Sequence, residues 1–365
     1  MKLRSLFGLA ASILILLTGC KEPDGASGGT SGAALYAYDS TTSAVFVWTD
    51  ISALYSSTTI TVAPTKQITS SVFSSKITTL AWGGLCLDSL HGYLYLVSET
   101  GSIVRVSNLR SQSGTVASNE VVSFSLSDTG RLTSSTFGQV ALDAQSDCLY
   151  ITENGSSSTQ IWVVNNASSQ VQSASITLQA LHTAGDTGGT GVAAASGSVY
   201  AFLLNGDQVG NATNTYTGPR LRKGAASAFT DASTLIGSNT LIEKYGSLAL
   251  DTGNGYLFVA RHNTDAGTLW ATFAPIQVFT TGQFGFGFNQ GPTAKLGSAT
   301  AQADLRVLAH AGTKDWLAGL SGQGTTAYGK IHLWKSPMGG TAAKVVSVSP
   351  TTAVFRGLAI DGNAS

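Results

Sequence analysis

Five polar residues occupy similar places in short repeated segments of the sequence. Three are carboxylates, Asp39, Glu99 and Glu153, and two, Arg261 and His262, are basic. Each follows the aromatic residue of an apolar segment by about three or four positions. If they converge, the carboxylates could hold a hard divalent cation such as Ca²⁺, or the mixed charges could bind a polar ligand. If they do not, they are solvated loop residues whose charge pairs contribute little.

Cys20 is the second group with chemistry. Lys2 and Arg4 precede an apolar run over residues 6–17, which has the charge order of a secretory signal and is short for a membrane span. The run ends in Leu17-Thr18-Gly19-Cys20, which resembles the bacterial lipoprotein box. The resemblance implies cleavage before Cys20, attachment of diacylglycerol to its thiol, and palmitate among the attached lipid chains. Because no Asp follows Cys20 directly, it also implies sorting to the outer membrane of the cell envelope.

These observations divide the chain into three parts. We predict a signal peptide over residues 1–19, and a lipidated cysteine with a flexible Gly- and Ser-rich tether over residues 20–32. Residues 33–365 form the folded domain. We expect a monomer that meets the membrane through its lipid anchor only.

Four aspartates recur at the ends of apolar segments: Asp88, Asp143, Asp251 and Asp361. Carboxylates are ligands for hard cations. An aspartate directly before a turn also accepts hydrogen bonds from the backbone N–H groups of that turn. Equivalent positions of a ring lie far apart, so we favour the turn-capping role and predict no metal there.

The composition excludes several classes of protein. Only 11% of the 365 residues are charged, and 20 basic residues balance 20 acidic ones, so nothing steers the chain toward nucleic acid. With 43% hydrophobic residues the chain can bury a large core, which excludes disorder. An exported compartment permits a disulfide between Cys86 and Cys148, but two free thiols remain the alternative.

The elements that must position these residues come from a repeat with a spacing of about 50 to 60 residues. A short apolar segment, usually preceded by glycine, occurs six times: Leu85-Cys86-Leu87-Asp88, Val140-Ala141-Leu142-Asp143, Val192-Ala193-Ala194-Ala195, Leu248-Ala249-Leu250-Asp251, Val307-Leu308-Ala309-His310 and Leu358-Ala359-Ile360-Asp361. A second strand follows most of these segments across a turn. These second strands are Leu94-Tyr95-Leu96, Leu149-Tyr150-Ile151, Val199-Tyr200-Ala201, Leu257-Phe258-Val259 and Trp316-Leu317-Ala318, with Leu35-Tyr36-Ala37 near the start.

Third strands are predicted around Trp48, Val104, Trp162, Trp270 and Trp334. The indoles of the four tryptophans would pack between sheets. Fourth strands rich in hydroxyl residues are predicted at residues 67–72 and 173–178.

The two ends of the repeat array complement each other. The last first-strand, at Leu358, has no second strand after it, and the first second-strand, at Leu35, has no first strand before it. Pairing the two closes a ring and removes exposed sheet edges. The sequence therefore predicts an all-β fold, a six-bladed β-propeller whose closing blade is shared between the N- and C-termini.

The segments Gly357-Leu358-Ala359-Ile360-Asp361 and Leu85-Cys86-Leu87-Asp88, the latter followed by Tyr93-Leu94-Tyr95-Leu96-Val97, resemble the repeats of NHL, SMP-30-like and TolB-like six-bladed propellers. SMP-30-like enzymes hold a metal on Glu, Asn and Asp at the channel mouth, but no position here matches their local motif. Two further segments break the repeat length: a polar one, residues 205–221, which ends in the basic cluster at residues 218–223, and a Phe-rich one, residues 282–291. They would contact a partner or pack onto the propeller.

Two functions follow as hypotheses. The first is a lipid-anchored binding or scaffolding module for a protein or polar ligand, without a cofactor. The second is a metal-dependent lactonase-like hydrolase at the channel mouth, with Ca²⁺ as its cofactor and Glu153 as its base. The sequence favours the first and leaves enzymatic activity open.

Overall fold

The computed structural model describes most of the chain from residue 32 onward. The described residues are 32–57, 61–156, 158–177, 179, 191–203, 209–211, 214–216, 220–225, 228–235, 247–260, 275–285, 291–297, 305–311, 314–321, 330–339, 344–348 and 352–363. They belong to one compact unit, Ser31–Ser365. None of the helices in these ranges is both long and apolar enough to cross a bilayer.

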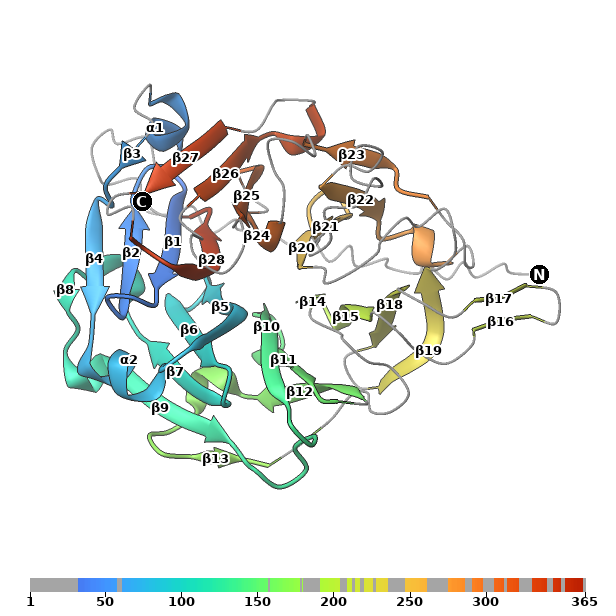
Figure 1. Ribbon diagram of the computed structural model, residues 1–365, viewed down its shortest axis with the longest axis horizontal. Helices are drawn as coiled ribbons and strands as arrows, with labels where there is room; N and C mark the ends of the chain where they lie inside the picture. Colours follow the sequence, from blue (N-terminus) through green and yellow to red (C-terminus); the bar gives the residue numbers. More distant parts are fainter. Residues whose placement is uncertain are drawn as a thin grey trace, which may run out of the picture. The chain divides into compact units, whose positions relative to one another are not determined.

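Six sheets of three to five strands form a ring and make the unit a six-bladed β-propeller (Figure 1). We number the blades in chain order, starting from the closing blade.

Blade 1 consists of β28 (Phe355–Asp361), β1 (Ala34–Asp39), β2 (Ala44–Trp48) and β4 (Lys66–Thr69). Blade 2 consists of β5 (Leu80–Asp88), β6 (Tyr93–Ser98), β7 (Ser102–Val106) and β9 (Val121–Leu126). Blade 3 consists of β10 (Thr136–Asp143), β11 (Cys148–Asn154) and β12 (Thr159–Asn165).

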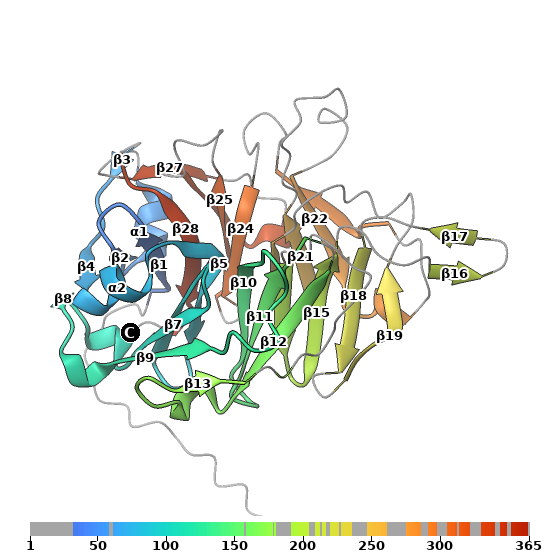
Figure 2. The ribbon, with the colours of Figure 1, turned by 60° about the horizontal axis from the view of Figure 1, so that its bottom comes forward.

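Blade 4 consists of β14 (Gly191–Ala195), β15 (Ser198–Leu203), β18 (Arg220–Ala225) and β19 (Ala228–Leu235). Blade 5 consists of β20 (Leu248–Asp251), β21 (Tyr256–Ala260), β22 (Ile276–Thr280) and β23 (Ala294–Leu296). Blade 6 consists of β24 (Leu305–Ala311), β25 (Trp316–Ser321), β26 (Lys330–Lys335) and β27 (Lys344–Val348). A separate hairpin, β16 (Val209–Asn211) with β17 (Asn214–Tyr216), projects from the ring in both ribbon views (Figure 2).

The closing blade confirms the predicted exchange between the two ends of the array. Strand β28 pairs antiparallel with β1, with Leu35 opposite Ile360 and Ala37 opposite Leu358. Phe355 of β28 packs edge-on against Phe46 of β2, with 5.6 Å between the ring centroids. The last described strand is therefore held by both a hydrogen-bond ladder and a buried apolar contact.

Three two-residue strands cover the outer edges of blades. Strands β3 (Thr61–Val62), β8 (Gly114–Thr115) and β13 (Ser175–Ile176) pair in parallel with β27, β4 and β9, the outermost long strands of the preceding blades in the ring. This covers backbone groups that would otherwise template association with another chain. Of the strand predicted at residues 67–72, β4 confirms residues 67–69, whereas residues 71 and 72 begin the helix Ser71–Lys76. The prediction at residues 173–178 is wrong in its partner, because β13 satisfies the edge of blade 2 instead of extending its own blade.

The short helices lie in the connections. Asp50 caps α1 (Ile51–Ser56) by accepting hydrogen bonds from the N–H groups of Ser52 and Ala53, and Ser70 caps α2 (Ser71–Lys76). The described 3₁₀ helices are η1 (Leu109–Ser111), η2 (Ser118–Glu120), η3 (Ala167–Ser169), η5 (Gln283–Gly285) and η6 (Pro337–Gly339).

Apolar clusters fill the space between neighbouring blades. Trp48, Trp162 and Trp334 are all buried in such clusters, which confirms the predicted packing role of these indoles. Trp270 lies outside the described residues. The third strand of blade 5 is Ile276–Thr280, not the segment around Trp270, because the longer apolar run Ile276-Gln277-Val278-Phe279 pairs with β21.

Some described residues of the two segments that break the repeat length contact blade 4. The described residues of the basic cluster lie in β18, the third strand of the blade, with Arg222 buried and the Lys223 ammonium 5.6 Å from the ring centroid of Tyr200. Phe284, in the Phe-rich segment, is also buried against Tyr200, with 5.4 Å between the rings. The described residues of the basic cluster and Phe284 therefore pack onto the propeller, whereas the hairpin of β16 and β17, in the polar segment before the basic cluster, forms a sheet of its own.

Candidate ligand-binding site at the channel mouth

The six inner strands surround a central channel of about 170 Å³. They are the first strands of the blades: β5, β10, β14, β20, β24 and β28. Each begins at the face where second strands end, near Asp39, Glu99 and Glu153, which we call the mouth face. Each ends at the opposite face, near Asp88, Asp143, Asp251 and Asp361, which we call the turn face. Most residues along the channel wall are apolar by type, and Gln139 and His310 are the polar ones.

Asp39 is buried and holds its own loop together. Its carboxylate accepts hydrogen bonds from the backbone N–H groups of Thr41 at 3.1 Å, Thr42 at 3.2 Å and Val354 at 2.8 Å. Val354 directly precedes β28, so Asp39 also fixes the approach of the closing strand. This carboxylate is an acceptor for backbone donors rather than part of an open ligand site.

Glu153 is fully buried and surrounded by donors. It accepts hydrogen bonds from Trp162 Nε1 at 2.6 Å and from the backbone N–H of Leu132 at 3.2 Å, and it pairs with Arg131 at 3.4 Å. Ser135 and Gln160 also contact its oxygens. With both oxygens engaged, Glu153 anchors the loop before β10 to the third strand of blade 3.

Of these three carboxylates, only Glu99 has a partly exposed side chain. Its Oε1 lies 2.6 Å from Nη1 of Arg356, and that guanidinium lies 4.9 Å from the ring centroid of Trp82. The guanidinium of Arg306 lies at the same distance from the Trp82 ring. We call Trp82, Glu99, Arg306 and Arg356 the mouth cluster. It joins blades 6, 1 and 2, which are consecutive in the ring.

The mouth cluster can bind chemically defined groups. An indole with two guanidinium groups offers an aromatic face and forked N–H donors, which suit a carboxylate, a phosphate or a planar polar ligand. The half-buried side chains of this cluster remain within reach of solvent. The sequence prediction missed Trp82, Arg306 and Arg356. Their common signal is that each stands one to three residues before the apolar core of an inner strand.

Gln139 lies across the mouth end of the channel. Its Oε1 accepts hydrogen bonds from the N–H groups of Val192 at 3.2 Å and Leu248 at 2.9 Å, and its Nε2 donates to the Leu248 carbonyl at 2.7 Å. A Cβ at position 83 would lie 2.9 Å from Gln139 Cγ, so Gly83, at φ +73°, leaves room for this side chain. Blades 3, 4 and 5 are thereby linked, and a ligand of the mouth cluster would sit on the face rather than deep in the channel.

The remaining predicted site residues, Arg261, His262 and Cys20, lie outside the described residues. Of the two other cysteines, Cys86 is buried and Cys148 half-buried, and both are free thiols. Burial raises the pKa of the Cys86 thiol above its usual range, so this thiol stays protonated.

The turn-face aspartates mostly cap their own turns, as predicted. Asp88 accepts hydrogen bonds from the N–H groups of Leu90 and His91, each at 3.0 Å, and Asp143 and Asp361 accept from Gln145 and Asn363. The alignment of the fifth repeat needs correction by one residue. Ala311, not His310, pairs with the first residue of the second strand, as the aspartates do in their blades.

His310 therefore occupies a position that is apolar in the other five repeats. The equivalent residues are Leu87, Leu142, Ala194, Leu250 and Ile360.

Comparison with solved structures agrees with the fold. A chain from the crystal structure of a nidogen/laminin complex superposes with a TM-score of 0.57 at 12% identity, covering 92% of this chain and all (100%) of that one. TolB from Acinetobacter baumannii superposes with a TM-score of 0.50 at 10% identity, covering 92% of this chain and 67% of TolB. At these identities the similarity concerns the fold alone. No protein-family model and no curated protein sequence matches the chain.

Proposed function

We propose that this chain is a lipid-anchored β-propeller of the bacterial cell envelope that binds a protein or polar ligand on its mouth face. The observation that carries the proposal is the mouth cluster, in which Arg306 and Arg356 each lie 4.9 Å from the ring centroid of Trp82. Three blades contribute to this partly exposed group, so a ligand would be recognised by the assembled ring.

The structural neighbours support a binding role by analogy. One of them was crystallised as part of a nidogen/laminin complex, and the other is TolB. Neither comparison identifies a ligand for this chain. The ligand chemistry follows from the cluster itself, which favours an anionic group, such as an acidic peptide segment or a carboxylated small molecule.

The carboxylates weigh against the hydrolase hypothesis. A general base must reach the proton that it removes, and a Ca²⁺ site needs several free oxygen ligands. Asp39 and Glu153 instead direct their oxygens at backbone N–H groups and the Trp162 indole. We therefore rank binding above metal-dependent lactone hydrolysis.

Photo-crosslinking on intact cells tests the binding role. A photoreactive amino acid at exposed Thr100, next to the mouth cluster, should give adducts whose masses are read by mass spectrometry. The adducts should disappear when Arg306→Gln and Arg356→Gln are combined, and the same probe at exposed Leu90 on the turn face should not give them. If Thr100 gives no specific adduct, and the protein hydrolyses lactones with a metal and loses this activity in Glu153→Gln, the hydrolase hypothesis replaces ours.

Metabolic labelling tests the anchor. Labelled palmitate should enter the wild-type chain and not Cys20→Ala, and membrane fractionation should place the acylated chain in the outer membrane. Equal labelling of the two chains would contradict acylation at Cys20.

A further inference from the structure

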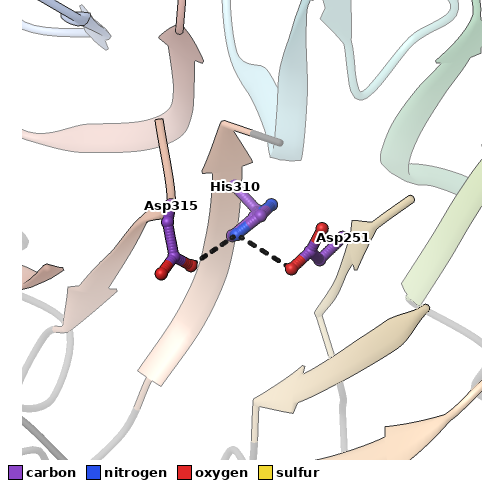
Figure 3. Close-up of side chains that lie close together, drawn as sticks. All are labelled: Asp251, His310 and Asp315. Atoms are coloured by element: carbon purple, nitrogen blue, oxygen red, sulfur yellow. Dashed lines mark ion pairs between the residues drawn. The ribbon is translucent and has the colours of Figure 1, made fainter. Parts of the chain in front are cut away.

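The group Asp251, His310 and Asp315 stands apart from the other turn-face aspartates. His310 Nε2 lies between two carboxylates, 3.9 Å from Asp251 Oδ2 and 3.9 Å from Asp315 Oδ1 (Figure 3). The three facing atoms all lie within 4.8 Å of one another. Asp251 comes from blade 5, and His310 and Asp315 come from blade 6.

The imidazole of His310 is buried without a partner. Only 1% of its side chain is exposed, and neither ring nitrogen has a hydrogen-bond partner. A separation of 3.9 Å is too long for a hydrogen bond, which needs about 2.7–3.2 Å. Buried polar groups are normally satisfied, so an unpartnered ring aimed at two carboxylates calls for an explanation.

We propose that Asp251, His310 and Asp315 bind one divalent transition-metal ion, for which zinc is the best-fitting candidate. One imidazole nitrogen and two carboxylate oxygens form a ligand set that zinc takes in proteins. With metal–ligand distances of about 2.0–2.2 Å, two tetrahedral ligands lie about 3.4 Å apart, so the site must contract by only a few tenths of an ångström per ligand.

The surroundings prepare each ligand for this role. Imidazole binds zinc through one ring nitrogen, and His310 Nε2 is the nitrogen that faces both carboxylates. The Phe258 ring stacks on the imidazole, with 5.3 Å between the centroids, and holds its plane.

The carboxylates are also oriented. Asn254 donates to both oxygens of Asp251, from its backbone N–H at 3.1 Å and its side chain at 2.8 Å. A carboxylate oxygen has two lone pairs, so Asp251 Oδ2 can accept from Asn254 and still face the ion. The carbonyl of Asp315 accepts the N–H of Ser336, while 41% of its side chain stays exposed. Asp315 can therefore move toward the ion and leave coordination positions open to water.

The other turn-face aspartates do not share this arrangement. Asp361 is paired with Arg110, Asp143 accepts the N–H of Gly197, and Asp88 is bonded to His91 at 2.7 Å. His310 is therefore polar where the other five repeats are apolar, and it lies at the junction that has a second nearby carboxylate, Asp315. The ion would join blade 5 to blade 6 on the face opposite the mouth cluster.

Metal titration of the full chain tests the inference. Untagged protein purified in detergent is treated with EDTA, dialysed and titrated with ZnCl₂ by calorimetry, and bound metal is counted by mass spectrometry. We expect one zinc per chain and a rise in unfolding temperature that saturates at one equivalent. Cobalt substituted for zinc should give the visible absorption bands of a nitrogen- and oxygen-ligated ion.

Two variants remove ligands without endangering the fold. His310→Leu restores the apolar residue of three other repeats, and Asp315→Asn changes a partly exposed side chain. Each should weaken zinc binding by at least about 100-fold. The matched control is His91→Gln, which removes the histidine of the Asp88 turn and should bind zinc as the wild type does.

Two results would overturn the inference. One is the absence of zinc, cobalt and manganese binding at one equivalent. The other is zinc binding that survives both His310→Leu and Asp315→Asn, because the ion would then be held elsewhere. Neither result bears on the mouth cluster, since the two sites lie on opposite faces.

Discussion

Asp361 and Asp251 hold the same position, at the end of the inner strand, in blades 1 and 5. Asp361 is bonded to Arg110 of blade 2 through Nε at 2.8 Å and a second guanidinium nitrogen at 3.2 Å. Asp251 instead faces His310 of blade 6 at 3.9 Å, with Asp315 on the other side of the ring. The residue supplied by the next blade therefore decides whether this repeated aspartate forms a finished ion pair or part of an open cation site.

The two junctions also differ in what they leave unsatisfied. At the Arg110–Asp361 junction, the guanidinium donates two hydrogen bonds to the carboxylate and is always charged. At the second, the nitrogens of a buried imidazole have no partner. The two junctions therefore share a backbone arrangement but differ in how their polar side chains are satisfied. Substitutions at each junction test this difference.

The largest effect is expected at the Arg110–Asp361 junction. Arg110→Met leaves the Asp361 carboxylate, whose side chain is 2% exposed, without its cation, so the free energy of unfolding should fall by about 3 to 5 kcal/mol. Asp361→Asn should cost less, because the Arg110 side chain is 37% exposed and can be solvated. Urea denaturation at neutral pH measures both. An equal or larger loss for Asp361→Asn would show that the burial asymmetry does not govern this junction.

Acid should weaken blade 6 next. Burial, with a smaller contribution from Lys330, lowers the pKa of His332 to about 4. Because the folded state holds this ring neutral while the unfolded pKa is about 6.5, its stabilisation is complete above that value and is lost as pH falls. The free energy of unfolding should drop by about 2 kcal/mol by pH 5 and by about 3 kcal/mol by pH 4, where the folded ring titrates.

The variant His332→Gln isolates this contribution from the titration of carboxylates. It can keep the hydrogen bond to Ser321, which lies 2.5 Å from His332 Nε2, yet it has no proton to gain. Urea denaturation between pH 7 and pH 4 in EDTA should give a flatter pH dependence for this variant. Parallel curves for the variant and the wild type would contradict the assignment.

The sequence was sufficient for the fold because the fold depends on repeated local signals. The apolar strands, the turn aspartates and the unmatched strands at Leu35 and Leu358 together predicted six blades and the closing pair. The register of the fifth repeat was misjudged because His310 resembled a polar strand end, whereas pairing with β25 places it one residue earlier. A one-residue difference of this kind is decided by the partner strand.

The candidate site was predicted less well, because its members are joined only by the ring. Position alone selected Glu153, but donors from a preceding loop and from Trp162 engage its oxygens. Trp82, Arg306 and Arg356 come from three blades, and the only signal they share is that each precedes the apolar core of its own inner strand. They meet only after the closing blade forms, so a single-sequence pattern could not join them.

A smaller effect, of opposite sign to Arg110→Met, is expected at the blade 5–6 junction. In EDTA, His310→Leu should raise the free energy of unfolding by about 1 to 2 kcal/mol, because it removes a buried polar ring that has no partner. With zinc present, the wild type should become the more stable chain. Urea denaturation under both conditions measures the reversal, and destabilisation by His310→Leu in EDTA would show that the imidazole is satisfied without metal.

The smallest effect is expected at Asp88, where the aspartate has a histidine partner within its own turn. His91→Gln removes a hydrogen bond whose imidazole is 42% exposed, while the two hydrogen bonds that Asp88 accepts from backbone N–H groups remain in place. The free energy of unfolding should therefore change by less than about 1 kcal/mol, because the buried carboxylate keeps its two backbone donors and the glutamine amide can replace the imidazole as the third. Denaturation curves with and without zinc should overlay for this variant and the wild type under each condition. If His91→Gln lowers the free energy of unfolding as much as Arg110→Met does, the comparison fails. Pairing within a turn would then stabilise the fold as much as a residue from the neighbouring blade.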